Sequence, residues 1–195
     1  EEKDSRFFFG REREARELLS LVISEPLVLF YAQSGAGKSS LINTRLGPGP
    51  RQEGFEVLPI GRVSGELPAG ITEVDNIFIF NLLLNLDQSQ AAPQQLTHTT
   101  LTDYLQTHRP ETSARDDDDD YEEPARVLII DQFEEIVTSH LDRWTEREGF
   151  FQQLRQAIND DPLLWVMLTL REDYVAALDP YARLLPGKLR ARFHM

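Results

Sequence analysis

The sequence contains no cysteine among its 195 residues, which excludes disulfide bonds, thiolate zinc sites and thiol catalysis. This absence suits a reducing cytoplasm, where we expect the protein to act. The chain also lacks any run approaching the roughly 20 apolar residues that cross a bilayer, so we expect no membrane contact. Its charged start, EEKDSR, has neither an initiator methionine nor the apolar core of a signal peptide, and we interpret the chain as a piece of a longer protein.

Positive charge is scarce, with 20 lysines and arginines against 33 acidic residues and a formal net charge of −13. No basic stripe alternates with aromatic residues, so direct nucleic-acid binding is disfavoured. Residues 111–123 contain eight acids against Arg115 alone and carry more than half of the net charge. Because like charges repel, we expect residues 111–124 to form a disordered, solvated loop. The alternative is a tract that binds cations or a basic partner.

Apolar runs of strand-like and helix-like length alternate along the chain. They predict strands over residues 27–31, 55–63, 126–131 and 163–170. They predict helices over 11–23, after the glycine-rich loop to about Leu46, and over 76–87, 101–108, 132–140, 144–159 and 172–178. Pro59 weakens the second strand or places it at a sheet edge. The alternation predicts an α/β fold with a parallel sheet covered on both faces.

Residues 27–39 read LVLFYAQSGAGKS, an apolar strand that breaks into a glycine-rich loop. The spacing is that of a phosphate-binding loop, with Ala32 in place of the usual first glycine. Backbone N–H groups would wrap a triphosphate, Lys38 would meet its β- and γ-phosphates, and Ser39 would bind Mg²⁺. The alternative is a chance match in an ordinary strand–turn–helix. The nucleotide-binding residues predicted here are Gln33, Ser34, Gly35, Ala36, Gly37, Lys38, Ser39 and Ser40.

Residues 127–136, VLIIDQFEEI, form a second motif in which a buried strand ends at an acid. We predict that Asp131 binds Mg²⁺ together with Ser39, because ligands collect at the carboxyl edge of open α/β sheets. Glu134 or Glu135 would orient and deprotonate an attacking water, and the sequence does not separate the two. The alternative is that both acids simply occupy the first turn of a helix, where acids are favoured.

An arginine ends a third apolar strand, in LTLRED at residues 168–173. At the carboxyl edge, Arg171 would reach the γ-phosphate and distinguish ATP from ADP. The alternative is a surface ion pair with Glu172 or Asp173, which would contribute little stability. We therefore predict Glu134, Glu135 and Arg171 as candidate catalytic residues.

The segments FFGRE at 8–12, AQSGAGKSS at 32–40, VLIIDQFEEI at 127–136 and LTLRED at 168–173 occur in one order. Together they resemble the STAND class, the signal-transduction ATPases with numerous domains, and especially its bacterial branch often fused to WD40, TIR or protease modules. The resemblance implies a three-layer P-loop sandwich of the additional-strand type. It also implies that Arg11 holds the adenine and that Arg171 is the sensor. Gln132 stands directly after Asp131, where many relatives in the larger class have glutamate.

On this resemblance the chain is one P-loop NTPase domain over residues 1–195. Its parts are an adenine-side segment and helix (1–25), the half with the glycine-rich loop (26–110), the acidic loop (111–124) and the half with Asp131 and Arg171 (125–195). LRARFHM begins a fifth strand, and the winged-helix region usual in the family would follow it. An arginine finger from a neighbouring protomer or an absent region raises turnover by roughly 10³–10⁵. If the family's finger comes from there, the isolated piece should hydrolyse ATP slowly.

The resulting hypothesis is an ATP switch that binds ATP or ADP with Mg²⁺ and controls conformation and oligomerisation. By resemblance, its partners would be further copies and fused sensor or effector domains in signalling or defence against phage. ATP is preferred over GTP because no Asn-Lys-x-Asp signature is present. The alternatives are a scaffold that binds nucleotide without hydrolysis, an ATP-driven DNA-processing motor and a small-molecule kinase. An ABC-type transporter subunit is disfavoured, because the sequence contains no LSGGQ-like signature.

Overall fold

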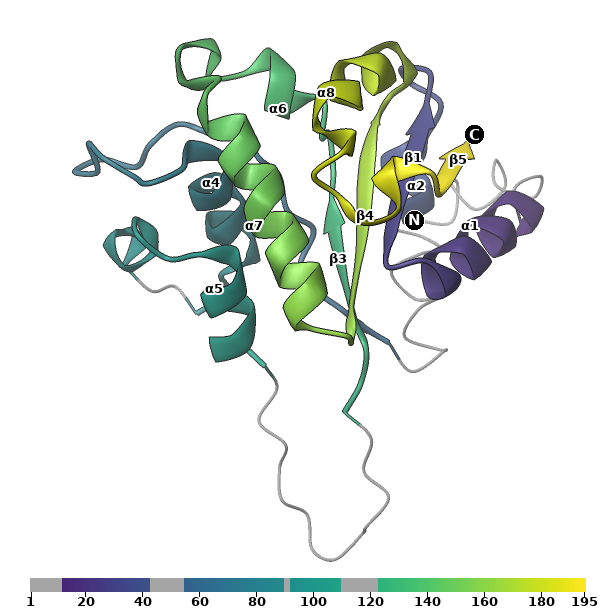
Figure 1. The fold of residues 1–195 in the computed structure, drawn as a ribbon, viewed down its shortest axis with the longest axis horizontal. Helices are drawn as coiled ribbons and strands as arrows, with labels where there is room; N and C mark the ends of the chain where they lie inside the picture. The colour runs from purple at the N-terminus through teal and green to yellow at the C-terminus, as the bar shows by residue number, and fades with distance from the viewer. Residues whose placement is uncertain (1–11, 43–54, 90–91, 110–122) are drawn as a thin grey trace, which may run out of the picture.

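Five parallel strands form one sheet with helices on both faces, in a computed structural model that describes residues 12–42, 55–89, 92–109 and 123–195 (Figure 1). The strand order is β2-β3-β4-β1-β5. The strands are β1 (Leu27–Ala32), β2 (Glu56–Val57), β3 (Arg126–Ile130), β4 (Leu164–Arg171) and β5 (Arg192–His194). The predicted α/β fold with a parallel sheet is confirmed.

β4 lies between β1 and β3, although it follows both in the sequence. This order is the additional-strand arrangement that the family resemblance implies. Because all the strands are parallel, their carboxyl ends meet at one edge of the sheet. The register pairs Ala32 at the end of β1 with Arg171 at the end of β4. The loops that follow β1, β3 and β4 are therefore neighbours.

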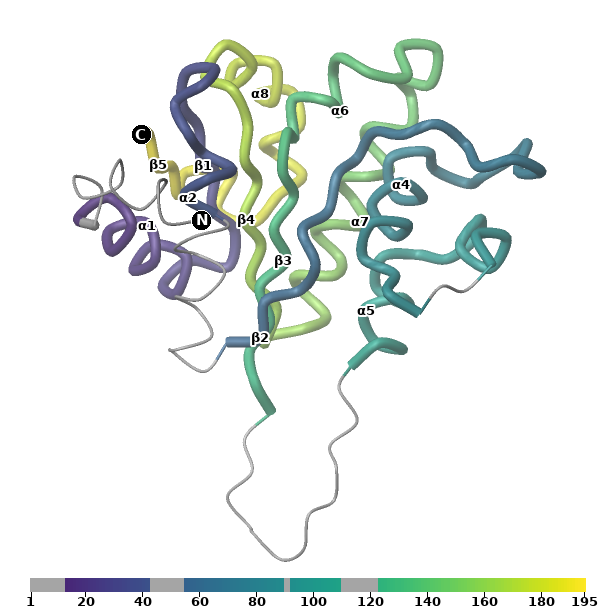
Figure 2. The backbone as a smooth tube through the Cα atoms, turned by 180° about the vertical axis from the view of Figure 1, so that it is seen from behind, coloured from purple at the N-terminus to yellow at the C-terminus, as the bar shows by residue number. Residues whose placement is uncertain are grey.

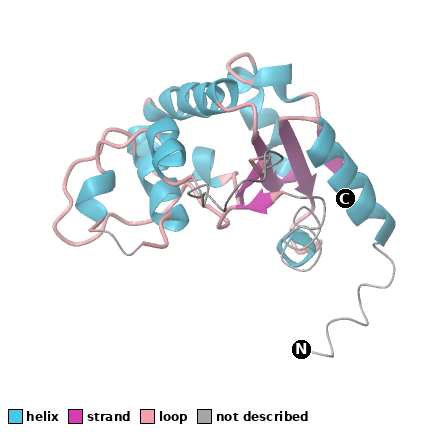
Figure 3. Ribbon diagram, turned by 90° about the horizontal axis from the view of Figure 1, so that it is seen from below, coloured by secondary structure: helices cyan, strands magenta, loops and turns pink. Residues whose placement is uncertain are grey.

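Alternating side chains along the strands divide the core into two layers. Val28 and Phe30 of β1 pack with α1 (Glu12–Ser24) and the start of α2 (Lys38–Leu41) on one face. Leu27 and Leu29 face the opposite layer, which contains α4 (Ile77–Leu86), α5 (Leu101–Thr107) and α7 (Glu146–Asp160). Figure 3 shows helices on both sides of the strands. No helix in these described ranges is both long and apolar enough to cross a membrane.

The apolar segment 76–87 is a buried helix, as its length predicted. Asn76 begins α4, because its side chain accepts hydrogen bonds from the Phe78 and Ile79 N–H groups, each at 3.1 Å. α1, α5 and α7 also form where the sequence predicted helices, within one or two residues at most ends. β5 pairs with β1, which confirms the expected start of a fifth strand.

The predicted strand over 55–63 is wrong in length, because β2 has two residues. Its pairing with β3 is regular as far as the Leu58 N–H, which donates to Val127 O at 3.0 Å, and resumes where the Gly61 N–H donates to Ile129 O at 2.9 Å. Pro59, between them, has no N–H to offer a further strand on the other side. Figure 2 shows this segment running beside β3 at the sheet edge, the place that Pro59 predicted.

Two helices are shorter or tighter than predicted. Within 132–140, only α6 (Glu135–Thr138) is α-helical, and 172–178 forms the 3₁₀ helix η5 (Glu172–Leu178). The sequence did not predict η3 (Pro93–Leu96), η4 (Leu141–Arg143), α8 (Asp179–Ala182) and η6 (Pro186–Leu189), because such short turns carry too little periodicity. Arg11, the part of the predicted helix beyond Ile42 and most of the acidic tract lie outside the described residues.

A buried ion pair ties the sheet to its helices at the amino edge, where β3 begins. Arg126 is 1% exposed and donates to Asp161 Oδ2 at 2.6 Å and to Leu105 O at 2.8 Å. The other carboxylate oxygen, Asp161 Oδ1, lies 3.0 Å from Arg109 Nη2. Burial raises the pKa of Asp161, but the Arg126 hydrogen bond, the Leu163 N–H and the charges of Arg126 and Arg109 outweigh it and hold that pKa below its usual value.

Candidate functional site

The glycine-rich loop joins the end of β1 to the start of α2 at the carboxyl edge of the sheet. Gly35 (φ 76°) and Gly37 (φ 91°) adopt left-handed conformations that a β-carbon would strain. The Ala36 N–H donates to Gln33 O at 3.2 Å and closes the turn. α2 begins at Lys38, whose ammonium reaches back across the loop to Ala32 O at 3.2 Å and Gln33 O at 3.5 Å. The loop thus holds a lysine over its own carbonyl groups.

Asp131 joins three elements at this edge. Its Oδ2 accepts a hydrogen bond from Ser39 Oγ of α2 at 3.1 Å. Its Oδ1 accepts one from the Thr169 hydroxyl of β4. The structure therefore brings together the two residues predicted to share a metal ion, Ser39 and Asp131, and adds Thr169. Sequence reasoning missed Thr169, whose signal was a single hydroxyl in the otherwise apolar strand LLWVMLTL.

The electrostatic setting of Asp131 fits a divalent cation. Its side-chain hydrogen bonds come from neutral hydroxyls, and no ion pair to it is found in the part of the chain that the structure describes. Ser39 and Asp131 offer oxygen ligands, the kind that a hard cation such as Mg²⁺ prefers. Within the same residues, no group of three or more histidines and acids lies close enough to hold a metal ion. The donor set thus suits an ion that takes few ligands from the protein.

The two glutamates, which the sequence could not separate, have different surroundings. Arg62 donates to both carboxylate oxygens of Glu135, with Nε at 3.3 Å from Oε2. Glu134 lines the cavity beside the glycine-rich loop, and its Oε2 accepts the Arg171 N–H at 3.3 Å. Glu134 precedes α6 but makes no capping hydrogen bond with its side chain. The sequence carried no signal for Arg62, which lies 73 positions from Glu135.

Arg171 ends β4 on the sheet face that also carries Thr169. Its Nη2 donates to Asp173 Oδ2 at 2.7 Å, and its guanidinium carbon lies 5.5 Å from the Tyr174 ring centroid. The hydrogen bond that Arg171 donates to Asp173 raises the pKa of the guanidinium, although burial opposes this, so the side chain stays cationic. Arg171 thus lines the cavity and also forms the alternative ion pair considered from sequence. Exposed pairs of this kind are weak, so the guanidinium can turn.

A cavity of about 400 Å³ collects these groups. Its lining residues are Ser34, Gly35, Gly37, Lys38, Ser39, Ser40, Asp131, Gln132, Glu134 and Arg171. Three predicted residues do not line it: Gln33 and Ala36 contribute to the loop backbone, and Glu135 is held by Arg62. Arg11 is outside the described residues. The cavity is open and polar, as a site for a charged ligand requires.

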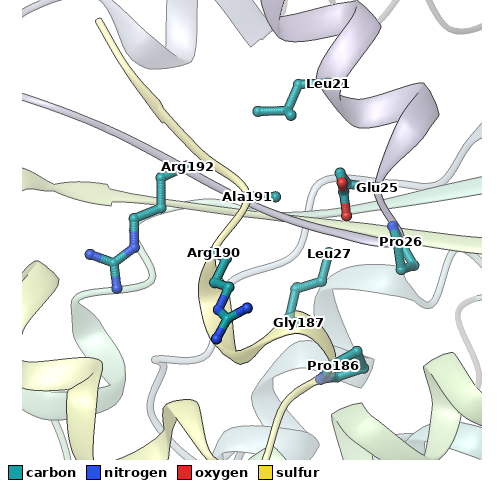
Figure 4. Close-up of a pocket in the computed structure, with 9 residues that line it drawn as sticks. All are labelled: Leu21, Glu25, Pro26, Leu27, Pro186, Gly187, Arg190, Ala191 and Arg192. Carbon is teal, nitrogen blue, oxygen red and sulfur yellow. The ribbon is translucent and has the colours of Figure 1, made fainter.

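A second cavity, of about 440 Å³, lies where β1 begins and therefore away from the glycine-rich loop at its end. Figure 4 shows Leu21 of α1 and Glu25, just after that helix, on one side and residues 190–192 on the other. It contains none of the predicted site residues. Cavity size therefore does not identify the site, whereas the convergence of polar side chains does.

Comparison with known proteins agrees with this geometry. Two structures of the ORC2 protein of Aeropyrum pernix, one described as ADPNP-ADP complexes and one as the ADP form, have TM-scores of 0.54 and 0.55. They share 16% and 18% sequence identity with 95% of this chain, which spans 47% and 48% of theirs. At such identities the likeness shows the fold, a P-loop ATPase fold. The comparison with curated proteins finds no significant match.

A family profile gives the more specific assignment. The profile described as Novel STAND NTPase 1 matches residues 1–194. This match covers both the described core and the segments between its parts, and it agrees with the resemblance in the motifs. The chain therefore belongs to the Novel STAND NTPase 1 family of nucleotide-binding NTPases.

Proposed function

We propose that this domain binds ATP with Mg²⁺, hydrolyses it slowly and acts as a conformational switch in a multidomain signalling or defence protein. The observation that carries the proposal is the meeting of Ser39, Asp131 and Thr169 beside the glycine-rich loop. A serine after the loop lysine and an acid at a strand end are 92 positions apart in sequence, yet lie in hydrogen-bond contact. A chance match in an ordinary strand–turn–helix has no reason to place them so.

Binding would use the loop backbone and Lys38. The ammonium now contacts two neutral carbonyl groups, and phosphate oxygens would offer it charge-assisted hydrogen bonds, which are stronger. Ser39 and Asp131 would hold Mg²⁺, which would neutralise charge on the β- and γ-phosphates. Thr169 would keep the Asp131 carboxylate oriented. ATP is assigned over GTP from the absent guanine signature and the family.

Hydrolysis would use Glu134 as the general base. Water oxygen attacks the γ-phosphorus, the water proton passes to the Glu134 carboxylate, and the bond from the γ-phosphorus to the bridging oxygen breaks. The bridging oxygen leaves with the electron pair on ADP. Arg171, on the same side of the cavity, would contact the γ-phosphate until it is released. An arginine contributed by another protomer would speed this step, so we expect the isolated domain to be slow.

The switch would follow from Arg171 changing partners. With ATP bound, its guanidinium would meet the γ-phosphate, and after release it would return to Asp173 and Tyr174. Moving a two-state equilibrium from 1:99 to 99:1 takes about 5.5 kcal/mol of differential binding. Contacts from Lys38, Arg171 and Mg²⁺ to one phosphate group are of that order. Self-association and the fused domains would respond to this change.

Calorimetry and single-turnover phosphate release test the proposal. Wild-type protein should bind ATP in the presence of Mg²⁺ and bind GTP more weakly. Glu134→Gln should retain ATP affinity but lose hydrolysis, whereas Glu135→Gln is the matched variant one residue away that does not face the cavity. Absence of ATP binding by the wild-type protein would overturn the whole assignment. A large affinity loss in Glu134→Gln would mean that this acid is structural.

A scaffold that binds ATP without hydrolysis is the second candidate. It is favoured by Gln132, which occupies the position directly after Asp131 and cannot act as a general base. Phosphate release from the full-length oligomer separates the two functions, because the oligomer includes contributions from neighbouring protomers. Tight ATP binding with no turnover there would establish the scaffold.

A further inference from the structure

We propose that Arg62 is a positioning residue that assigns different roles to the two adjacent glutamates. It binds Gln132 and holds the Glu135 carboxylate, which does not line the nucleotide cavity, and thereby leaves Glu134 facing that cavity. The inference rests on the proposed function and adds a residue that does not line the cavity itself. Its evidence is the contacts of the Arg62 guanidinium with Gln132 and Glu135, which lie 70 and 73 positions away in the sequence.

The backbone that carries Arg62 is fixed against β3. The Gly61 N–H donates to Ile129 O, and the Asp131 N–H donates to Gly61 O, both at 2.9 Å. A β-carbon at Gly61 would lie 2.3 Å from Leu82 Cδ1 of α4, so the segment packs as closely as glycine allows. Arg62 therefore extends from a rigid point, and Asp131 is tied to the same point through its own N–H.

The guanidinium binds two residues of the loop that follows Asp131. It donates to both oxygens of Glu135 and to the side-chain oxygen of Gln132. Gln132 has a left-handed backbone (φ 51°), which is unfavourable for a residue other than glycine and needs support from its surroundings. Arg62 supplies this support directly. The bidentate pair with Glu135 also fixes orientation in a way that a point charge does not.

The rest of the loop is held from the other side. Phe133 is fully buried, and its N–H donates to Thr169 O at 2.7 Å. Asp131, Gln132, Phe133 and Glu135 are therefore each tied to Gly61, β4 or Arg62. Glu134 is the remaining acid of the loop, and its carboxylate meets the Arg171 N–H at the cavity. The arrangement allows one glutamate to act on water while its neighbour is neutralised.

Removing Arg62 would leave the Glu135 carboxylate, whose side chain is 18% exposed, without its cation. Its charge would then repel Glu134 and Asp131, and Gln132 would lose its hydrogen bond. The loop should lose its single orientation. Within the described part of the chain, no hydrogen bond or ion pair joins Arg62 to Lys38 or Ser39, so ATP binding should be largely retained.

The experiment compares ATP affinity with single-turnover phosphate release at saturating ATP and Mg²⁺. Arg62→Ala should lower the rate by roughly tenfold or more and change Kd by less than about threefold. Arg62→Lys should recover part of the rate, because lysine restores the charge but not the bidentate geometry. Arg155→Ala, an exposed arginine on α7, is the matched control and should behave as wild type.

A double-mutant cycle sharpens the result. If Arg62 acts through Glu135, adding Arg62→Ala to Glu135→Ala should cost much less than Arg62→Ala costs alone. Additive losses would overturn the proposal, as would a normal rate in Arg62→Ala. If Arg62→Ala lowers the melting temperature, the test compares Arg62→Lys with a stably folded Arg62→Gln. Lysine keeps the positive charge and glutamine does not, so equal rates of phosphate release in these two variants would overturn the proposal.

The failures of the two proposals are distinguishable. If the wild-type protein binds no ATP, the proposed function fails. If it binds ATP but releases no phosphate above the Glu134→Gln background, hydrolysis and the role of Arg62 both fail while binding stands. If the wild type hydrolyses ATP and Arg62→Ala is unaffected, only the positioning role fails.

Discussion

One aspartate lies at the amino ends of the strands and another at their carboxyl ends. Each is held by groups from other elements, but the partners of the two carboxylates differ in charge. At the amino edge, Asp161 is paired with Arg126 and Arg109, so its charge is neutralised within the protein. At the carboxyl edge, Asp131 contacts the hydroxyls of Ser39 and Thr169, which orient a carboxylate but leave its charge. Asp161 therefore stabilises the fold, whereas the negative charge of Asp131 is available to a cation.

The two cavities, one at each end of β1, also differ in the side chains that line them. Near the start of β1, the described residues that border the larger cavity are mostly prolines, leucines and two arginines, with a single acid, Glu25. At the other end of β1, loop glycines, a lysine, hydroxyls and acids line the smaller one. Glycine-rich loops and strand ends supply these groups because the carboxyl edge of a parallel sheet is where backbone direction changes. Function is therefore expected at that edge.

The largest effect should come from removing one charge at the amino edge. Asp161→Asn leaves Arg126, which is 1% exposed, without its closest counter-charge. Breaking a buried pair in this way costs about 3–5 kcal/mol in the free energy of unfolding. Urea denaturation measures it, and Asp131→Asn is the matched substitution at the opposite edge. An equal loss in both variants would show that the two edges do not differ as described.

Lys38→Ala should have the next largest effect, on ATP affinity rather than stability. Lys38 is the one lysine among the described residues that line the cavity, and losing its phosphate contacts should weaken binding by roughly a hundredfold, about 2.7 kcal/mol. Calorimetry with ATP and Mg²⁺ measures this change. Lys188→Ala, far along the chain in η6, serves as the control. Retained micromolar affinity in Lys38→Ala would contradict the loop assignment.

Asp131→Asn should have a smaller effect that depends on Mg²⁺. Removing the carboxylate charge should weaken ATP binding by roughly tenfold with Mg²⁺ present, about 1.4 kcal/mol, and little in its absence. The free energy of unfolding should change by less than about 1 kcal/mol, because no cation in the described residues pairs with Asp131. Equal affinity of wild type and variant at all Mg²⁺ concentrations would remove Asp131 from the proposed metal site.

The smallest effect should appear in the pH dependence of stability. The pKa of Asp161 is lowered in the folded protein, so the unfolded chain binds its proton first as pH falls. Its contribution is fully present above the ordinary value of 3.8 and is lost as pH falls below it. The stability difference between wild type and Asp161→Asn should therefore narrow below about pH 4. A difference that stays constant from pH 6 to pH 3 would argue against this coupling.

Local patterns predicted much of this architecture. The apolar runs of β1, β3 and β4, the buried helix α4 and the glycine-rich loop are each encoded in contiguous residues, and all were identified within a few positions. The helices η3, η4, α8 and η6 were not, because three or four residues carry no usable periodicity, and β2 was predicted as a strand but too long. The edge position of β2 was predicted from Pro59 alone, since proline cannot donate to a second neighbour.

By itself, the sequence determined the fold class, the glycine-rich loop and the acid at the end of β3, because each depends on residues that are neighbours in the chain. Only the tertiary structure decided that Thr169 accompanies Asp131, that Arg62 holds Glu135 and that Glu134 faces the cavity. The contacts of Thr169 and Arg62 join residues 38 and 73 positions apart. The first exists because β4 lies beside β3 and the second because the segment after β2 runs along the other side of β3, and strand order is a property of the whole packed sheet.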